Sequence, residues 1–304
     1  MRTQRSCSWY VVIFAILAGV GAAAPARPTA QKGEPFTVHP GLVYSAVDRK
    51  LALDLYLPEP SFARPVPAVL VIQGGGFLAQ DGRKFRPFAA YLARHGFAAA
   101  LIAYRGRPDH RYQDTVADTK AAIRFVRKVA AQYAIDPNRI GAMGRSAGGT
   151  LAALLAVTGG ESAWEGQGGH PEFSSRIQAA VAISGVFDFV ARFTEERQIA
   201  LQPAVKAKAE TNGQWLGSPF SSRDEHWLRA SAVNHVDRGD PPVLFLHCQD
   251  DATVPWLQSQ AMVEKMQATG IKSEVVYYPT GGHGYKGRDA EAMAEMVRFF
   301  RQAL

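Results

Sequence analysis

The sequence predicts an α/β fold, in which helices cover both faces of a mostly parallel sheet. From residue 68 to the C-terminus, short apolar runs typical of buried strands alternate with longer segments of helical periodicity. One of these runs, at residues 139–143, leads through Gly144-Arg145-Ser146-Ala147-Gly148 into a helical segment, which is a strand–turn–helix pattern. The 304 residues suffice for one large domain of this class.

The elements follow in chain order. Leu51, Leu53, Leu55 and Leu57 alternate with less apolar residues, which predicts a half-buried hairpin strand at a sheet edge. A proline-rich connection follows at residues 58–67. We expect further strands at residues 68–72, 97–104, 139–143, 177–183, 243–247 and 273–278. We expect helices at residues 86–94, 114–133, 147–157, 256–269 and 289–303.

The N-terminus has the pattern of a secretory signal peptide. Arg2 and Arg5 precede an apolar run at residues 9–20, and small residues follow. We predict a signal peptide at residues 1–26, cut after Ala26, and hence a secreted or periplasmic protein. The alternative is an uncleaved membrane anchor, for which the run is short. The predicted linker is 27–41, and the predicted domain is 42–304.

Composition and charge narrow the functional classes. The net charge is +7, but the basic residues are dispersed and form no aromatic-interleaved motif, so we expect no nucleic-acid partner. No metal-ligand spacing, P-loop or dinucleotide glycine motif occurs, so we expect no cofactor and no metal. Once the signal peptide is removed, Cys248 is the only cysteine, which excludes an intramolecular disulfide. We expect Cys248 to be a small buried residue.

The Gly144-to-Gly148 segment predicts a nucleophilic serine. A sharp turn between strand and helix needs glycine on both sides of Ser146, because a Cβ there would clash with the neighbouring strand and helix. The helix that begins at Ala147 directs its free amides and its positive dipole end at the same place. The alternative for Ser146 is a helix N-cap, which does not require the flanking glycines.

An acid and a histidine follow in the order that a serine nucleophile needs. Asp251 follows the apolar run at residues 243–246, and His283 lies in a glycine-rich loop after another strand-like run. The order Ser146, Asp251, His283 is that of a catalytic triad on an α/β sheet, and each residue follows a strand. The neighbouring Asp250 is the alternative acid.

A glycine run upstream supplies candidate oxyanion-hole donors. Gln73-Gly74-Gly75-Gly76-Phe77 follows the buried-strand run at residues 68–72. We predict that the amides of Gly75, Gly76 and Ala147 form the oxyanion hole.

Residues about 187–232 interrupt the strand–helix alternation. This insertion is longer than an ordinary connection and is rich in aromatic residues. It either covers the site and shapes its pocket or forms a small core of its own. As pocket residues we predict Phe77, Arg145, Phe187, Trp215 and Tyr285, with a solvent-exposed side chain as the alternative for Arg145.

These motifs together resemble those of the α/β-hydrolase esterases. Gln73-Gly74-Gly75-Gly76-Phe77 is similar to their His-Gly-Gly-Gly-Trp loop, and the segments at 136–149 and 251–255 are similar as well. The resemblance is greatest to the group of bacterial feruloyl and acetyl-xylan esterases, kin of the hormone-sensitive-lipase-like esterases, and covers roughly residues 42–304. It implies an α/β-hydrolase fold with a mostly parallel, eight-stranded sheet and a small insertion near the site. Its spacing selects Asp251 rather than Asp250 as the acid.

The resemblance implies an exported serine carboxylic-ester hydrolase acting on short acyl or aryl esters, such as those of acetylated or feruloylated polysaccharide. We expect no stable membrane span after signal cleavage. Gln73 replaces the usual histidine and Cys248 a usual glycine, which affects the expected geometry of the oxyanion loop and the acid loop. Two alternatives stay open: a serine peptidase of the prolyl-oligopeptidase kind, and a non-catalytic binding protein with this fold.

Overall fold

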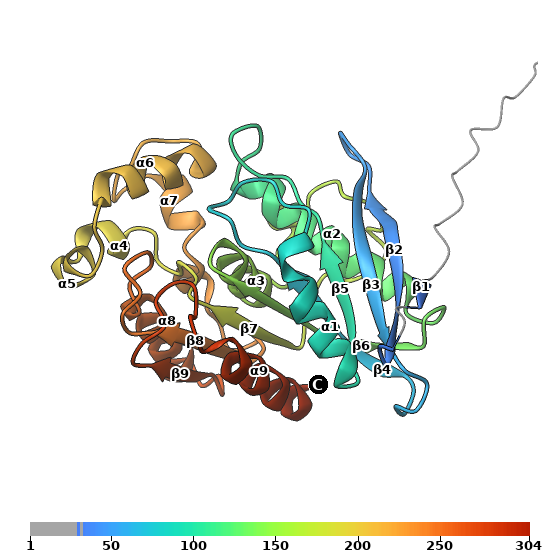
Figure 1. Ribbon diagram of the computed structural model, residues 1–304. Coiled ribbons are helices and arrows are strands. Elements are labelled where there is room, and N and C mark those ends of the chain that lie inside the picture. Colours follow the sequence, from blue (N-terminus) through green and yellow to red (C-terminus); the bar gives the residue numbers. More distant parts are fainter. Residues whose placement is uncertain (1–28, 31–32) are drawn as a thin grey trace, which may run out of the picture.

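The computed structural model describes residues 29–30 and 33–304 and places their strands in one sheet (Figure 1). The strands are β1 (Thr29–Ala30), β2 (Phe36–Ser45), β3 (Leu51–Pro58), β4 (Val66–Ile72), β5 (Ala98–Ile102), β6 (Ile135–Arg145), β7 (Ala179–Ile183), β8 (Val243–Cys248) and β9 (Glu274–Tyr278). The α-helices are α1 (Arg86–Arg94), α2 (Tyr112–Val129), α3 (Ala147–Val157), α4 (Ala191–Thr194), α5 (Glu196–Ala200), α6 (Val205–Leu216), α7 (Glu225–Arg229), α8 (Leu257–Ala268) and α9 (Asp289–Ala303). Short 3₁₀ segments are η1 (Arg83–Phe85), η2 (Ser162–Trp164) and η3 (Ala232–His235).

The sheet confirms the predicted α/β-hydrolase architecture. Its order is β1-β2-β3-β5-β4-β6-β7-β8-β9, and β5, β4 and β6 through β9 are parallel. Eight of these strands have five or more residues, and β1 adds a two-residue edge. Because parallel strands end at the same edge, the loops after β4, β6, β8 and β9 meet there. All predicted strands and helices after residue 68 are present, and α1, α3 and α9 have the predicted bounds.

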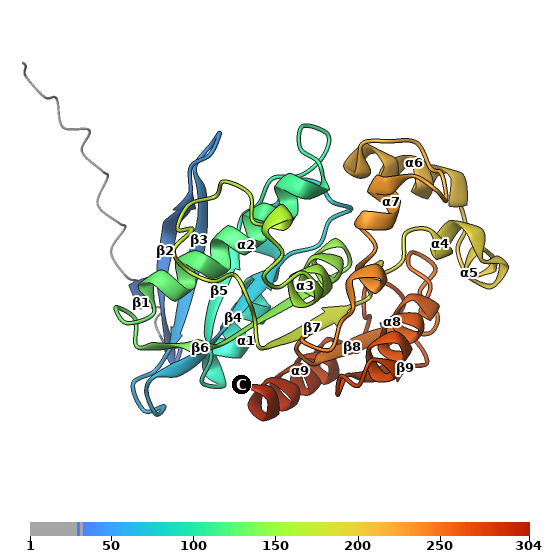
Figure 2. The same ribbon diagram turned by 180° about the vertical axis from the view of Figure 1, so that it is seen from behind.

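Helices cover the two faces of the sheet and form two cores. Helices α1 and α9 pack on one face, where their buried residues join those of β4, β7 and β8 (Figure 1). Helices α2, α3 and α8 pack on the other face (Figure 2). Strands β5, β7 and β8 are buried on both faces, which explains why they read as continuous apolar runs.

Two predictions about the N-terminal part are wrong. The predicted linker at 27–41 reaches into β2, which starts at Phe36 and pairs with β3. Because β2 and β5 flank β3, this strand is not at the sheet edge. The burial of Phe36 and Val38 against Tyr56 and α1 supplies the reason, since these contacts are distant in sequence. The predicted signal peptide, 1–26, lies outside the described residues.

The insertion contains α4 to α7, and Figure 1 shows these helices gathered at one end of the sheet. Its aromatic side chains pack on one another: the ring centroids of Trp227 and Phe220 lie 4.9 Å apart, and those of Phe193 and Phe220 lie 5.4 Å apart. This packing gives the insertion a small aromatic core, which merges with the core around α2 and α3.

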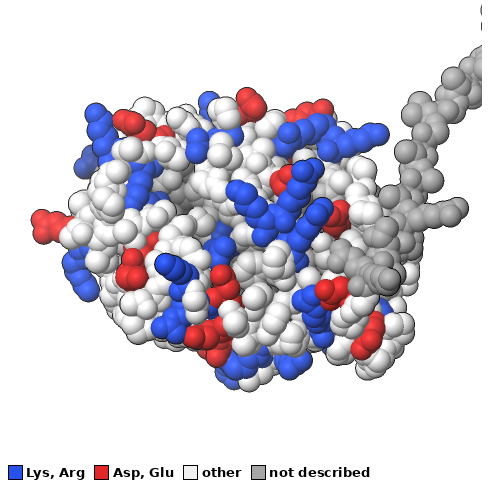
Figure 3. Space-filling view, viewed as in Figure 1, with Lys and Arg blue, Asp and Glu red and all other residues white. Residues whose placement is uncertain are grey.

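The charged surface is mixed. Figure 3 shows basic side chains gathered over the region where α1 begins, with acidic side chains close by. Arg83 and Lys84 lie in η1 and Arg86 begins α1. Within the described part of the chain, no helix is both long and apolar enough to cross a membrane.

Candidate active site

Ser146 lies in a sharp turn between β6 and α3. Its φ is 58° and its ψ is −124°, a backbone conformation that is strained for a residue with a side chain. A Cβ on Gly144 would lie 2.2 Å from the carbonyl oxygen of Gly148, and one on Gly148 would lie 2.1 Å from that of Ile72. Both contacts are impossible, so the two flanking glycines are required for the steric reason that the sequence predicted.

The structure brings Ser146, His283 and Asp251 into one hydrogen-bonded chain. Nε2 of His283 lies 2.8 Å from Oγ of Ser146, and Nδ1 lies 2.7 Å from Oδ2 of Asp251. Asp251 is buried, and the His283 side chain is 26% exposed. With Nδ1–H donating to the carboxylate, Nε2 is free to accept the proton of the serine hydroxyl.

Hydrogen bonds keep Asp251 ionised. Burial opposes ionisation, but hydrogen bonds and charge from His247 and His283 outweigh it and hold the pKa of Asp251 well below its usual range. The other oxygen, Oδ1, accepts from the amides of Thr253 and Val254 at 2.8 and 3.0 Å. His247 is itself fixed, with Nδ1 2.7 Å from Oγ of Ser259. The carboxylate is therefore both charged and fixed in orientation.

Asp250, the alternative acid, has a different role. Its two oxygens accept from the amides of Gly281 and Gly282 at 3.1 and 2.7 Å. Asp250 thus holds the loop that carries His283, while Asp251 faces the imidazole. Next to it, Cys248 is buried, as expected, and burial raises the pKa of its thiol to about 11. A protonated, buried thiol is a poor nucleophile.

The glycine loop after β4 is braced from both sides of Gln73. The side-chain oxygen of Gln73 accepts from the amide of Lys84 at 2.8 Å, and its side-chain nitrogen donates to Oε1 of Gln80. The Tyr104 hydroxyl donates to the main-chain carbonyl of Gln73. The glutamine therefore braces the loop with its amide group, as an imidazole would with its ring nitrogens.

The glycine loop borders Ser146 through Gly76. Gly75 and Gly76 have positive φ, 155° and 58°, and a Cβ on Gly75 would lie 2.4 Å from Nε2 of Gln80. Arg107 holds the loop from outside, with Nε donating to the carbonyl of Gly76 at 2.7 Å. Ala147 is the first residue of α3, where the amide has no acceptor within the helix. Gly76 and Ala147 thus line the space beside Ser146, and Gly75 does not.

A small cavity, which we call the inner cavity, opens beside Ser146. It has a volume of about 220 Å³. Its lining residues come from the glycine loop, the serine turn, the insertion and the acid loop: Gly76, Phe77, Ser146, Ala147, Val186, Arg192, Ala207, Lys208, Thr211, Asn212, Thr253 and Val254.

Of the five predicted pocket residues, only Phe77 lines the inner cavity. Trp215 is buried behind Phe77, with the two rings stacked 3.8 Å apart. Phe187 is buried against Phe245. These two predictions are wrong, because the insertion turns its large aromatic rings into the core rather than toward the serine.

Tyr285 and Arg145 also lie away from the inner cavity. Tyr285 is buried, and its hydroxyl accepts from Oγ of Ser184 at 3.2 Å. Arg145 forms an ion pair with Asp289 at 2.9 Å, and its guanidinium lies 5.9 Å from the Tyr285 ring centroid. The Arg145 side chain is 24% exposed, so it reaches solvent in part, as the alternative expected, although an ion pair holds it. Asp289 at the start of α9 therefore holds Arg145 away from the cavity, and the contacts of Tyr285 with Ser184 and Tyr278 hold that ring in the core.

Sequence reasoning missed Arg192, Lys208 and Asn212 as lining residues. Lys208 and Asn212 share one face of α6 with Thr211, at helical spacing. The sequence of α6 mixes small and polar residues all round, so no hydrophobic pattern marks the face that turns inward. Only the packing of the helix reveals that face.

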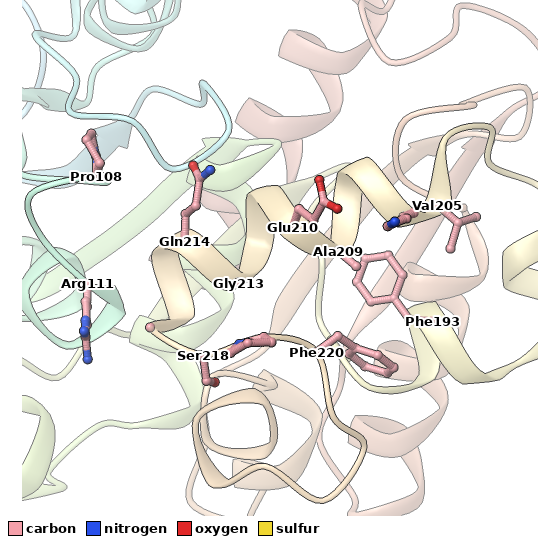
Figure 4. A pocket seen from close by; sticks show the side chains of 13 residues that line it. Pro108, Arg111, Phe193, Val205, Ala209, Glu210, Gly213, Gln214, Ser218 and Phe220 are labelled. Carbon is pink, nitrogen blue, oxygen red and sulfur yellow. The ribbon is translucent and has the colours of Figure 1, made fainter.

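A second, larger cavity of about 1050 Å³ lies on the other side of α6, and we call it the outer cavity (Figure 4). Glu210 and Gln214 of α6 are among its lining residues, with Phe193 and Phe220 at one end of it and Arg111 at the other (Figure 4). It shares no lining residue with the inner cavity. Among the described residues, no group of three or more His, Cys, Asp or Glu is placed to hold a metal ion.

The sheet order, the turn at Ser146 and the Ser146–His283–Asp251 geometry define a domain of the α/β-hydrolase class. Within this class the chain belongs to the family described as BD-FAE, which matches residues 53–266. Proteins similar to it include a probable carboxylic ester hydrolase and a carbohydrate esterase.

Known relatives agree with this assignment. The chain is similar to a "probable carboxylic ester hydrolase LipM" of Mycobacterium tuberculosis, with 30% identity over 77% of this chain and 52% of the relative. The chain thus spans about half the length of the curated relatives it matches. A solved "truncated form of carbohydrate esterase from gut microbiota" has 27% identity and a TM-score of 0.78, covering 90% of this chain and 99% of that one. Butyrate-bound esterase Est2 of Thermogutta terrifontis has 28% identity and a TM-score of 0.69, covering 86% and 92%.

Proposed function

We propose that this protein is an exported serine carboxylic-ester hydrolase that acts on short acyl or aryl esters, such as those of acetylated or feruloylated polysaccharide. Its nucleophile is Ser146, its general base is His283, and Asp251 orients the base. The observation that carries the proposal is the chain of hydrogen bonds from Asp251 through His283 to Ser146, at 2.7 and 2.8 Å.

The first half-reaction forms an acyl-enzyme. Oγ of Ser146 attacks the ester carbonyl carbon while Nε2 of His283 takes the hydroxyl proton. The imidazolium that results is stabilised by the ionised, buried Asp251. The carbon–oxygen bond to the alcohol then breaks, and His283 gives its proton to the departing alkoxide. In the second half-reaction His283 takes a proton from water as the water oxygen attacks the acyl carbon. The bond from that carbon to Oγ of Ser146 then breaks, His283 returns the proton to Oγ, and the acid is released.

The developing oxyanion is held by main-chain amides. The amides of Gly76 and Ala147 belong to residues that line the inner cavity beside Ser146. Such donors are preorganised, because the backbone holds them in place before the reaction begins. Loss of one donor typically lowers the rate by roughly 10²–10³. The amide of Gly75, in the same loop, is the third donor that the proposal includes.

Cavity size and known relatives support the choice of substrate. The inner cavity, at about 220 Å³, has room for roughly seven water molecules, at about 30 Å³ each. A short acyl group fits a space of this size. Among similar solved structures are a carbohydrate esterase and an "acetyl ester-xyloside bifunctional hydrolase" from Caldicellulosiruptor lactoaceticus. Export rests on the predicted signal peptide, and cleavage after Ala26 predicts a mature chain beginning at Arg27.

The direct test is hydrolysis of p-nitrophenyl acetate, butyrate and octanoate by the chain without residues 1–26. We expect rapid hydrolysis that decreases with acyl length. Ser146→Ala is expected to lower kcat by about 10⁴–10⁶. Methyl ferulate and acetylated xylan then distinguish aryl from acetyl specificity.

Lack of Ser146-dependent turnover on every ester would contradict the proposal. Turnover of an aminoacyl amide without turnover of esters would instead identify the peptidase alternative. Failure of Ser146 to react with an organophosphonate probe, in a folded protein, would favour the binding protein.

A further inference from the structure

The inner cavity contains two basic side chains without an acidic partner. Arg192 and Lys208 both line it, and no Asp or Glu is among its lining residues in the described chain. Neither of them takes part in an ion pair within 4.0 Å among the described residues. Arg192 is only 4% exposed, so its charge is almost entirely removed from water. A buried charge without a partner is costly and calls for an explanation.

The known contacts of these two side chains do not need a positive charge. Arg192 donates from Nη2 to the carbonyl of Thr253 at 2.6 Å and from Nε to Oε1 of Gln202 at 3.0 Å. Lys208 donates from Nζ to the carbonyl of Ala252 at 2.6 Å. These acceptors are all neutral, so none of them supplies a negative charge to balance the two cations. Two of the five N–H groups of Arg192 are thereby used, and its guanidinium lies 5.2 Å from the centroid of the Phe193 ring, but no carboxylate of the described residues contacts it.

The buried aspartate nearby balances them only from a distance. Asp251 favours the charged form of both side chains from a distance, but its carboxylate is already bound by His283 and lies 3.4 Å from His247. Burial lowers the pKa of Arg192 only to about 10, so Arg192 stays charged at neutral pH. Burial and the charge of Arg192 lower the pKa of Lys208 as well.

A third side chain of the inner cavity, that of Asn212, has an unsatisfied polar group. Nδ2 of Asn212 is buried and has no hydrogen-bond partner, although Asn212 lines the inner cavity and is only 5% exposed. A buried amide nitrogen without an acceptor is uncommon in proteins and costs free energy. An acceptor inside the cavity would satisfy it. Arg192, Lys208 and Asn212 therefore surround the cavity with donors and positive charge.

We propose that the inner cavity binds a carboxylate group of the ester substrate, so that the preferred esters are anionic. This inference rests on the proposed esterase function and specifies its substrate class. The carboxylate accepts hydrogen bonds from Arg192, Lys208 and Asn212, and it belongs either to the acyl part or to the alcohol part of the ester. Charge-assisted hydrogen bonds of this kind are among the strongest available to a protein.

The test compares anionic esters with neutral esters of the same shape. For the alcohol side, 3-acetoxybenzoate is compared with 3-acetoxybenzamide. For the acyl side, monomethyl glutarate is compared with its carboxamide, methyl 5-amino-5-oxopentanoate. We expect kcat/KM to be at least about tenfold higher for the anionic member of one pair, and the pair that responds tells on which side the carboxylate lies. Raising the salt concentration should reduce this ratio.

Two variants of α6 form a matched pair for the same ratio. Lys208→Met is expected to reduce the ratio of anionic to neutral kcat/KM severalfold, whereas Lys206→Met, on the side of α6 that faces the outer cavity, should leave it unchanged. If Lys208 only supports the acid loop, Lys208→Met would lower kcat/KM equally for the anionic and the neutral ester. The ratio would then stay the same, which would overturn the proposal.

The wild-type protein alone also decides the matter. Equal kcat/KM for both members of both pairs, with Ser146-dependent hydrolysis of the neutral esters, would overturn the carboxylate site while leaving the esterase function in place. Hydrolysis of none of the four esters would instead contradict the proposed function. The two failures are thus distinguishable, and neither depends on a variant that folds poorly.

Discussion

The two cavities on either side of α6 differ in size, charge and relation to the nucleophile. The inner cavity, about 220 Å³, contains Ser146 and is lined by Arg192 and Lys208. The outer cavity, about 1050 Å³, lies away from the nucleophile, and its lining includes Phe193 and Phe220. One helix forms a wall of each.

The difference shows that the larger cavity is not the reactive one. Ester hydrolysis needs a serine, a base and amide donors within hydrogen-bond reach of one another. Of the two cavities, only the inner one is lined by a triad residue, Ser146. A small space with donors fixed around it also selects substrates more sharply than a wide one, because each polar group left without a partner costs free energy. The comparison therefore assigns catalysis and charge selection to the inner cavity.

After Ser146→Ala, the largest effect is expected at the acid that orients the base. Asp251→Asn should lower kcat by about 10⁴, because an amide cannot hold His283 in the required tautomer. Steady-state kinetics on p-nitrophenyl acetate measure this loss. Asp250→Asn is the matched control and should cost far less, since its side-chain oxygen still accepts from a loop amide. Equal losses of kcat in both variants would show that Asp251 is not the acid that orients His283.

Filling one cavity at a time tests the division between them. Thr211→Trp places an indole in the inner cavity, where overpacking costs about 1–3 kcal/mol, and it should lower kcat/KM roughly ten- to hundredfold. Glu210→Trp, one residue earlier on the opposite side of α6, should change kcat/KM by no more than about twofold. A larger loss from Glu210→Trp would show that the outer cavity also takes part in substrate binding.

Arg107 connects the two cavities. Its Nη1 donates to Oε1 of Gln214, which lines the outer cavity, and its Nε donates to the carbonyl of Gly76 beside the inner one. Arg107→Ala should lower kcat about tenfold with little change in KM, because the glycine loop loses a support while the cavity keeps its shape. Arg111→Ala, in the outer cavity alone, serves as the control. A change confined to KM would mean that Arg107 acts on binding instead.

The smallest effect belongs to a carboxyl group outside both cavities. Burial raises the pKa of Asp240 to about 6 from the ordinary 3.8, so its ionised form is disfavoured in the folded state. Stability is therefore lost as the pH rises from about 4 through 6, and Asp240→Asn should remove that loss without effect below pH 4. We expect a gain of less than about 1 kcal/mol, because solvent screens this half-exposed group. Thermal unfolding at pH 3.5 and 7.5 measures it; a gain at both pH values would exclude ionisation as the cause.

Local sequence patterns were sufficient to predict the sheet and the three residues brought together at its edge. The apolar runs after residue 68 became strands, and the glycines around Ser146 were required for the predicted steric reason. Local patterns gave less information about strands that form mainly through pairing with distant parts of the sequence, such as β2. β2 carries few signals of its own, because its hydrophobic residues are recognised only through their contacts with β3 and α1.

The sequence by itself determined the order of Ser146, Asp251 and His283 and the place of each after a strand, since strand periodicity and glycine sterics act over a few residues. The tertiary structure alone decided what surrounds them. It turned Phe187 and Trp215 into the core and brought Arg192 and Lys208 to the cavity beside Ser146. The physical reason is that the lining of a cavity depends on how helices pack against the sheet, and that packing is set by residues far apart in the chain.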